Sequence, residues 1–172
     1  GKTDLALQLA SKFQGELISV DSRQVYKDLD IGTGKMPGKK VAVKKGKGFW
    51  EMNGVKVWMY DMADYKKQYT VYDYVKDANK VIDDILKRDK LPIIVGGTGF
   101  YLKAFLEGLP NLSIPYDLKL RVKLEKLSLS DLQKKLQKTA NNKWEKMNYS
   151  DRQNPRRLVR AIELVTLYPQ RI

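Results

Sequence analysis

A run of apolar residues that leads directly into a glycine-rich turn and then a helix constrains this chain more than any other feature. The run occupies residues 92–95, the turn is Gly96-Gly97-Thr98-Gly99, and the helical spacing of apolar residues resumes over 100–106. A short continuous apolar run is typical of a strand that is buried on both faces. Strand, tight turn and helix in this order form the repeating unit of α/β folds. The sequence therefore predicts an α/β fold with a parallel sheet flanked by helices.

The other elements follow from hydrophobic spacing and from residues that begin or end helices and turns. Thr70 is a candidate N-cap, Pro155 suits the first turn of a helix, and Asn53-Gly54 is a strong turn signal between two β-rich runs. The predicted elements are helices over 3–13, 70–88, 100–106 and 156–167, strands over 16–20 and 92–95, a hairpin over 49–60, two short helices within 118–136, and loops over 32–48 and 141–150.

The residue types that are absent narrow the chemistry. The sequence has neither cysteine nor histidine, which excludes disulfides, thiolate or imidazole metal sites and triads with a histidine base. Acid–base chemistry must therefore come from Asp, Glu, Lys or Tyr. The net charge of +13 favours a polyanionic partner, nucleic acid or a phosphorylated substrate, although a general lysine bias would give the same surplus. No apolar run approaches the roughly 20 residues of a membrane-spanning helix, so no membrane partner is expected.

The sequence opens on Gly1-Lys2-Thr3 followed by a helical pattern, which matches the last part of the P-loop motif. In that motif, backbone amides at a helix N-terminus hold phosphate oxygens, the lysine supplies a cation and the hydroxyl can hold Mg²⁺. The same three residues also suit a frayed chain terminus, and the tripeptide alone does not decide between these interpretations.

Two further polar clusters follow predicted strands. Asp21 comes directly after the strand over 16–20, and Gly96, Gly97 and Thr98 follow the strand over 92–95. In an open α/β sheet, ligands bind beyond the carboxyl ends of the strands, which places Asp21 near a P-loop phosphate as a base or an indirect Mg²⁺ ligand. The alternatives are that Asp21 caps a helix and that the glycines form an ordinary strand-to-helix turn.

Four arginines gather at the last predicted helix: Arg152, Arg156, Arg157 and Arg160. Arg156 and Arg160 lie four residues apart and share a helix face. Guanidinium groups suit a diphosphate or an RNA backbone because they present several donors in one plane. A solvated basic helix face is the alternative interpretation of the same cluster.

Taken together, these motifs resemble the tRNA dimethylallyltransferase family, also called the tRNA isopentenyltransferases or IPP transferases. The strings Asp-Ser-Arg-Gln-Val-Tyr and Gly-Gly-Thr are specific to the family in this combination. The matching strings occur in family order, outside the lysine-rich loop and the residues over 110–150, and they lie at residues 1–6, 18–26, 30–35, 91–104 and 156–163.

The resemblance implies a fold, a reaction and partners. The fold would be a P-loop NTPase-like parallel sheet flanked by helices, with a small helical insertion. The reaction would transfer a dimethylallyl group from dimethylallyl diphosphate to the exocyclic amine of the adenosine 3′-adjacent to the anticodon. Mg²⁺ would be the cofactor, the anticodon stem-loop of tRNA would be the macromolecular partner, and the enzyme would be a cytoplasmic monomer.

The resemblance also implies residue roles. Asp21 would be the general base and Thr98 would line the channel near the reacting carbon. Arg157 or Arg160 would stabilise the departing diphosphate, and Thr3 would help to place Mg²⁺. The remaining substrate-binding residues would be Gly1, Lys2 on the diphosphate, Ser22, Arg23, Gln24, Tyr26, Gly96, Gly97 and Tyr101, with Thr3 among them.

The family pattern divides the chain into an α/β core over 1–109, a helical tRNA-binding insertion over 110–150 and a helix over 151–172 that returns to the core. The first strand and the start of the P-loop of that pattern lie outside this sequence, so we expect a fragment cut at both ends and inactive by itself. Two other functions stay open: a P-loop nucleoside or nucleotide kinase that uses ATP with Asp21 as base, and a non-catalytic RNA-binding remnant.

Overall fold

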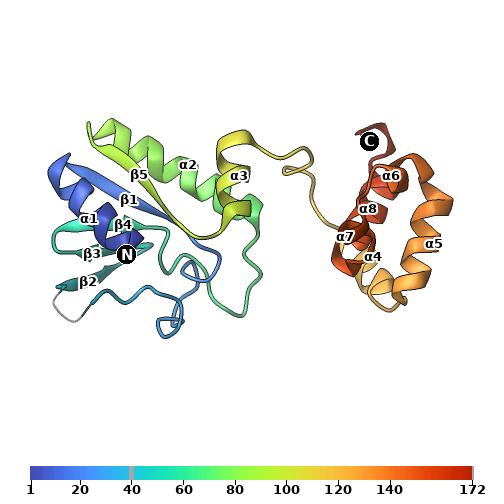
Figure 1. The fold of residues 1–172 in the computed structure, drawn as a ribbon, viewed down its shortest axis with the longest axis horizontal. Coiled ribbons are helices and arrows are strands. Elements are labelled where there is room, and N and C mark those ends of the chain that lie inside the picture. The colour runs from blue at the N-terminus through green and yellow to red at the C-terminus, as the bar shows by residue number, and fades with distance from the viewer. Residues whose placement is uncertain (39–40, 172) are drawn as a thin grey trace. The chain divides into compact units, whose positions relative to one another are not determined.

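The chain forms two compact units that meet in sequence between Ser113 and Ile114 (Figure 1). The computed structural model describes residues 1–38 and 41–171. The first unit is built on a five-stranded sheet with helices packed against it, and the second unit is helical. The predicted α/β fold is therefore confirmed.

The centre of the sheet is parallel. Its strand order is β2-β3-β4-β1-β5. The central strand β1 (Gly15–Val20) pairs in parallel with β4 (Val55–Trp58) on one side and with β5 (Leu91–Gly96) on the other. All six residues of β1 are buried, as expected for a strand covered on both faces.

The remaining strands form an antiparallel meander. The predicted hairpin is confirmed: β3 (Phe49–Met52) pairs with β4 across Asn53 and Gly54, which both have positive φ. The prediction that residues 32–48 form only a loop is wrong in part, because Val43–Gly46 forms β2 at the edge of the sheet. Its lysines face solvent, as is typical of edge strands. The segment therefore lacks the alternation of apolar and polar residues that predicts a strand.

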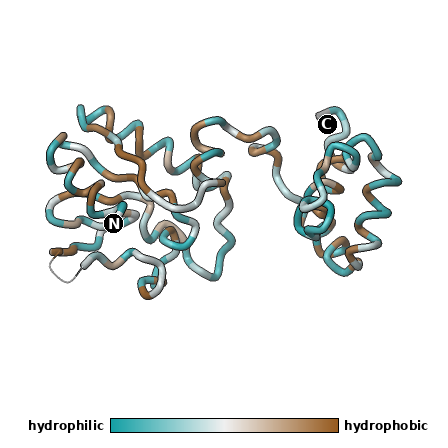
Figure 2. The backbone as a smooth tube through the Cα atoms, viewed as in Figure 1, coloured by the Kyte–Doolittle hydropathy of each residue, from teal (hydrophilic) through white to brown (hydrophobic). Residues whose placement is uncertain are grey.

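Apolar cores lie on both faces of the sheet, and Figure 2 shows hydrophobic residues concentrated along its central strands. On one face, α1 (Lys2–Lys12) packs Ala6 and Ala10 against Leu17 and the buried Trp50. On the other face, the core around Ile18 is completed by buried residues of two helices. These helices are α2 (Val71–Lys87), which Thr70 caps as predicted, and α3 (Gly99–Glu107).

The prediction that residues 92–95 are fully buried is wrong. They are half-buried, because β5 is an edge strand of the sheet that the structure describes. A cavity of about 470 Å³ lies beside β5, and its apolar lining includes Leu5 and Leu9 of α1 and Leu102 of α3. The continuous apolar run predicted the strand correctly but not its position in the sheet.

The second unit has its own apolar core. Leu132, Leu136, Leu158 and Ile162 are buried together in it. The helices are α4 (Leu118–Leu124), α5 (Leu129–Thr139), α6 (Asn141–Glu145), α7 (Tyr149–Arg152) and α8 (Pro155–Leu167), followed by the 3₁₀ turn η1 (Pro169–Arg171).

The prediction that residues 141–150 form a loop is wrong in part, because α6 and the start of α7 lie within this segment. Trp144 and Met147 pack against the core of the second unit, and the Asn148 side chain accepts the Asp151 N–H at 2.8 Å. Two apolar anchors and one helix cap therefore order a segment whose composition is polar. The division into residues 1–109, 110–150 and 151–172 is still a prediction, and the structure adds that α8 shares its core with α4 and α5.

Within the described residues, none of the helices is both long enough and apolar enough to cross a membrane.

A buried carboxylate lies near the start of the central strand β1. Glu16 is 1% exposed and accepts hydrogen bonds from both terminal nitrogens of Arg88, at 2.6 and 2.8 Å. Lys90 and the Trp58 indole N–H also donate to it, at 2.8 and 2.7 Å. Burial alone would raise the pKa of Glu16, but the hydrogen bonds from Arg88, Lys90 and Trp58 outweigh it and lower the pKa to about 2.

We expect Glu16→Gln to lower the free energy of unfolding at pH 7 by about 2 kcal/mol, since it removes the buried negative charge that three partly exposed donors share. The folded pKa of about 2 lies below the unfolded value of about 4.3, so this stabilisation is present at neutral pH. It is lost as the pH falls from the unfolded pKa toward the folded one. Urea unfolding at pH 7 and pH 3 measures both effects.

The matched control is Asp84→Asn, which removes an exposed carboxylate that also pairs with Arg88, at 2.8 Å. Its effect should stay within about 0.5 kcal/mol, as for other exposed ion pairs. Equal losses for the two variants, or a Glu16→Gln effect that does not shrink at pH 3, would contradict the role given to Glu16.

Candidate functional site

The ends of two parallel strands and the start of a helix supply the candidate site. β1 and β5 pair in register from Gly15 opposite Leu91 to Val20 opposite Gly96. The residues that follow, Asp21 on one strand and Gly97 on the other, therefore leave the sheet side by side. This is the carboxyl edge of the sheet, where α/β proteins bind ligands.

The turn after β5 lies directly against the end of β1. The backbone N–H groups of Gly97 and Thr98 both donate to the carbonyl oxygen of Val20, at 3.1 and 3.0 Å. A Cβ atom on Gly96 would overlap that same carbonyl group, so the position requires glycine for a close approach rather than for flexibility. A Cβ on Gly97 would instead meet only the Asp21 Oδ2, at 3.9 Å.

Side chains link the two strand ends. The Thr98 hydroxyl oxygen accepts the Ser22 backbone N–H at 3.0 Å, and it lies 3.4 Å from the Ser22 Oγ. The Asp21 Oδ1 accepts the backbone N–H groups of Arg23 and Gln24 at 2.8 and 3.4 Å. The carboxylate is thus fixed through one oxygen, while its other oxygen lies toward Gly97.

The start of α1 brings a cation to this edge. Lys2 is exposed, and its Nζ donates to the carbonyl oxygen of Gly96 at 3.3 Å. Gly1 is the N-cap residue, and the half-buried Thr3 lies in the first turn. The structure therefore brings the predicted residues Lys2, Asp21 and Thr98 to one edge of one sheet. What each of them binds is still a prediction.

The residues here fit a magnesium ion that is held mainly by a ligand. Among the described residues, no group of three His, Cys, Asp or Glu side chains is placed to hold a metal. Mg²⁺ is often bound by one or two protein oxygens together with waters and substrate phosphates, so a rich carboxylate set is not needed. The Thr3 hydroxyl at the start of α1 and the Asp21 carboxylate are oxygen donors of the right kind.

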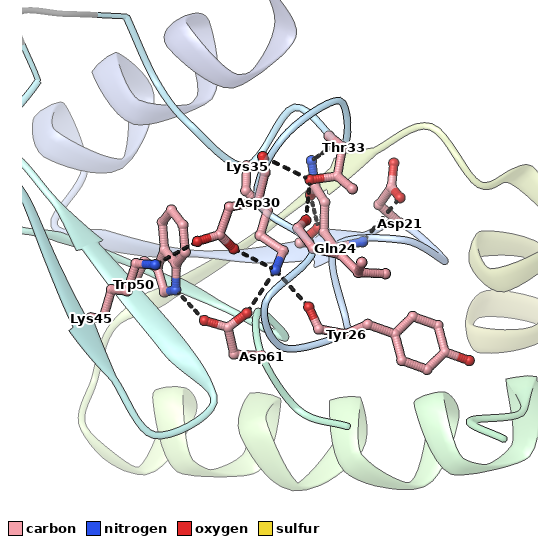
Figure 3. Close-up of polar contacts among 11 residues, drawn as sticks. Asp21, Gln24, Tyr26, Asp30, Thr33, Lys35, Lys45, Trp50 and Asp61 are labelled. Atoms are coloured by element: carbon pink, nitrogen blue, oxygen red, sulfur yellow. Dashed lines mark hydrogen bonds and ion pairs between the residues drawn. The ribbon is translucent and has the colours of Figure 1, made fainter. Parts of the chain in front are cut away.

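The segment after Asp21 is held by contacts that sequence reasoning did not find (Figure 3). The Gln24 amide accepts the Ser19 hydroxyl at 2.6 Å and donates to the carbonyl oxygen of Thr33 at 3.0 Å. The carbonyl oxygen of Tyr26 accepts the Lys35 ammonium at 2.6 Å. In the sequence, Lys35 is a lysine inside a glycine-rich loop, a setting that indicates an exposed side chain rather than a buried one.

Tyr101, predicted to bind substrate, is buried beneath the turn. Its ring packs on that of Tyr74, with 4.6 Å between centroids. Burial, aided by nearby negative groups that include Asp21, raises the pKa of Tyr101 to about 12. The phenol therefore stays protonated at neutral pH and does not supply a base.

The two candidate arginines lie on α8 in the second unit. Arg157 pairs with Asp151. Arg160 pairs with the buried Glu163 and donates to the carbonyl oxygen of Ile114 at 2.9 Å. The choice between them as a diphosphate contact is still open, and the structure adds that Arg160 is already part of the packing of its own unit.

Several known proteins are similar to this chain in sequence. A family model described as IPP transferase matches residues 24–172. Proteins named tRNA dimethylallyltransferase from Streptococcus pyogenes, including those of the strains Manfredo and SSI-1, are 41% identical over 168 residues. The match covers 95% of this chain and 50% of each relative. The chain thus spans about half the length of the curated relatives it matches.

Solved structures give the same result. The full-length tRNA isopentenylpyrophosphate transferase from Bacillus halodurans matches with a TM-score of 0.56 and 32% identity, over 98% of this chain and 52% of that one. A eukaryotic dimethylallyltransferase, described as acting on tRNA, matches with a TM-score of 0.71 and 29% identity, over 96% of this chain and 38% of that one.

The close approach of Gly96 to Val20 gives a direct prediction. Gly96→Ala should lower the free energy of unfolding by about 1–3 kcal/mol, because the new methyl group has to push the two strand ends apart. Gly97→Ala is the matched control, since its methyl group meets only ordinary van der Waals contact. Urea unfolding of the two variants compares them, and equal stability would show that the turn does not depend on this contact.

Proposed function

Because this chain belongs to the IPP transferase family, we propose that it carries the transfer site of a tRNA dimethylallyltransferase. The donor would be dimethylallyl diphosphate, and the acceptor would be the exocyclic amine of the adenosine 3′-adjacent to the anticodon. The observation that carries the proposal is the meeting of Lys2, Asp21 and Thr98 at one sheet edge.

The reaction needs one proton acceptor and support for one leaving group. The bond between the prenyl C1 and the diphosphate oxygen breaks, and a bond from C1 to the adenosine N6 forms. The electron pair of the broken bond leaves with the diphosphate, and N6 loses one proton. An aryl amine is a weak nucleophile, so a placed base assists the attack, and cations assist the departure of the diphosphate.

Asp21 is suited to take the proton. Two backbone N–H groups hold its Oδ1, so the carboxylate is oriented before substrate binds. Its Oδ2 lies toward Gly97, in the direction of the turn that presents Thr98. Since the chain has no histidine, a carboxylate at this place is the natural acceptor.

The start of α1 is suited to hold the diphosphate. Backbone N–H groups at a helix N-terminus and the exposed Lys2 ammonium attract phosphate oxygens. Mg²⁺, held by the Thr3 hydroxyl and by the diphosphate itself, would neutralise charge on the leaving group. The Thr98 hydroxyl accepts the Ser22 N–H at 3.0 Å and donates to the Ser22 Oγ at 3.4 Å, a long contact that a bound oxygen would replace.

The second unit is suited to bind the RNA backbone. Its exposed lysines include Lys134, Lys135 and Lys138 on α5, whose apolar face is buried through Leu132 and Leu136. Phosphate contacts release counterions, so such a surface gives RNA affinity that falls with salt.

Asp21→Asn in the whole gene product tests the proposed chemistry. The amide keeps the shape and the hydrogen bonds to Arg23 and Gln24 but cannot take the proton, so turnover should fall ~10²–10⁴-fold. The affinity for tRNA should stay within about twofold of the wild-type value, because a base acts on the reacting proton and not on the RNA backbone. Mass spectrometry of nucleosides from the tRNA measures turnover, and filter binding measures affinity.

Asp28→Asn is the matched control, since Asp28 is exposed, has a positive φ that asparagine tolerates, and lies in the same segment after β1 as Asp21. Its turnover should equal that of the wild type. Normal turnover in Asp21→Asn would remove Asp21 from the mechanism, and no turnover in the wild type with dimethylallyl diphosphate would overturn the proposed function.

The basic surface of α5 gives a second test. Changing Lys134, Lys135 and Lys138 together to glutamine should flatten the dependence of log affinity for tRNA on log salt, by about 0.9 for each duplex phosphate that the lysines no longer neutralise. The control changes three exposed lysines of α2 to glutamine, Lys76, Lys80 and Lys87, which alters the net charge equally. An unchanged slope in the α5 variant, or equal changes in both, would place the RNA surface elsewhere.

A further inference from the structure

Lys35 is a lysine with no exposed side-chain surface. Its ammonium group has three N–H donors and three acceptors around it: the carbonyl oxygen of Tyr26 at 2.6 Å, the Asp30 Oδ1 at 3.0 Å and the Asp61 Oδ1 at 2.7 Å. Figure 3 shows these contacts converging on the Nζ atom. A buried charge with every donor in use fixes the three segments that supply the acceptors.

One of these segments reaches Gln24 through the main chain. The backbone N–H of Asp61 donates to the carbonyl oxygen of Gln24 at 3.3 Å. The Asp61 side chain also accepts the indole N–H of the buried Trp50, so this carboxylate is held from two sides. Asp61 has a positive φ of 55°, an uncommon conformation for a residue other than glycine, which the contacts to Lys35 and Trp50 stabilise.

A second segment reaches Gln24 through its side chain. Lys35 holds Asp30, and the Thr33 hydroxyl closes the same loop by donating to the carbonyl oxygen of Leu29 at 2.7 Å. The carbonyl oxygen of Thr33 then accepts the Gln24 amide at 3.0 Å. The main chain and the side chain of Gln24 are thus both set by segments that Lys35 joins.

Gln24 in turn contacts the proposed base. Its backbone N–H lies 3.4 Å from the Asp21 Oδ1, beside the shorter contact from Arg23. We propose that Lys35 is a positioning residue for the transfer reaction, which orients Gln24 and, through it, the Asp21 carboxylate. This inference rests on the proposed function, in which Asp21 takes the proton.

A purely stabilising role explains the cluster less well. Taking charges out of water is unfavourable, and apolar residues of similar volume are often as stable as a buried ion cluster. What the ion cluster adds is a fixed set of distances, because each N–H points at one acceptor. Lys45 offers a comparison, since it pairs with the same Asp30 at 2.6 Å but is 54% exposed.

A double-mutant cycle in the whole gene product separates positioning from stability. The variants are Lys35→Met, Gln24→Ala and the two together, with kcat and the KM for tRNA measured well below the unfolding temperature of each. Lys35→Met should lower kcat by ~10–100-fold, since small misplacements of a catalytic group have effects of this size. The KM should stay within about twofold, and the double variant should be no slower than the slower single variant.

Lys45→Met is the matched control. Its kcat should equal that of the wild type, and its effect should add to that of Gln24→Ala without coupling. If circular dichroism shows that Lys35→Met does not fold, Asp30→Asn replaces it in the cycle, because it weakens the same contact from a partly exposed partner and the same lack of additivity is expected. Additive losses, a normal kcat, or an effect confined to KM would overturn the inference while the proposed function stands. A wild-type protein without turnover would overturn both.

Discussion

The parallel pairing of β1 with β5 is the interaction on which the candidate site depends. It runs without interruption from Gly15 to Val20 on one strand and ends at Gly96 on the other. Because the Val20 carbonyl oxygen then accepts two N–H groups of the following turn, the ends of the two strands are joined rather than merely adjacent. Asp21 and Thr98 owe their proximity to this joint, and any ligand that needs both depends on it.

Three buried ion clusters among the described residues each stabilise a different part of the chain. Glu16 gathers cations at the amino end of β1, at the end of the strand away from the candidate site. Lys35 gathers carboxylates near the site itself, where it joins loops instead of regular elements. In the second unit, Glu163 joins α8 to α4 through Arg121 at 3.0 Å. Burial would raise the pKa of Glu163, but the hydrogen bonds from Arg121 and Arg160 outweigh it, so the pKa is lowered and the carboxylate stays charged at neutral pH.

The sequence predicts those parts of the structure that local chemistry decides. The capping by Thr70, the turn at Asn53 and the strand-to-helix turn after β5 are each determined by a few neighbouring residues, and all three are confirmed. The exposure of β5 at the sheet edge and the burial of Lys35 beside Asp61 depend on segments outside their own local sequence. The strand β2 pairs with the neighbouring β3, but its exposed lysines give no apolar alternation that would indicate a strand. The types of residue at the site were therefore predictable, whereas the contacts that orient them were not.

Hydrogen–deuterium exchange of the whole gene product, with dimethylallyl diphosphate and Mg²⁺ and separately with ATP and Mg²⁺, shows whether one ligand binds where β1 and β5 end. We expect the prenyl donor to protect the peptides over residues 19–26 and 95–101 together, because one ligand that binds where β1 and β5 end contacts both. The peptide that carries Arg88, which pairs with Glu16 at the opposite end of β1, should not change. Protection by ATP alone, or protection of only one of the two strand ends by the prenyl donor, would rule out a prenyl-donor site at this sheet edge.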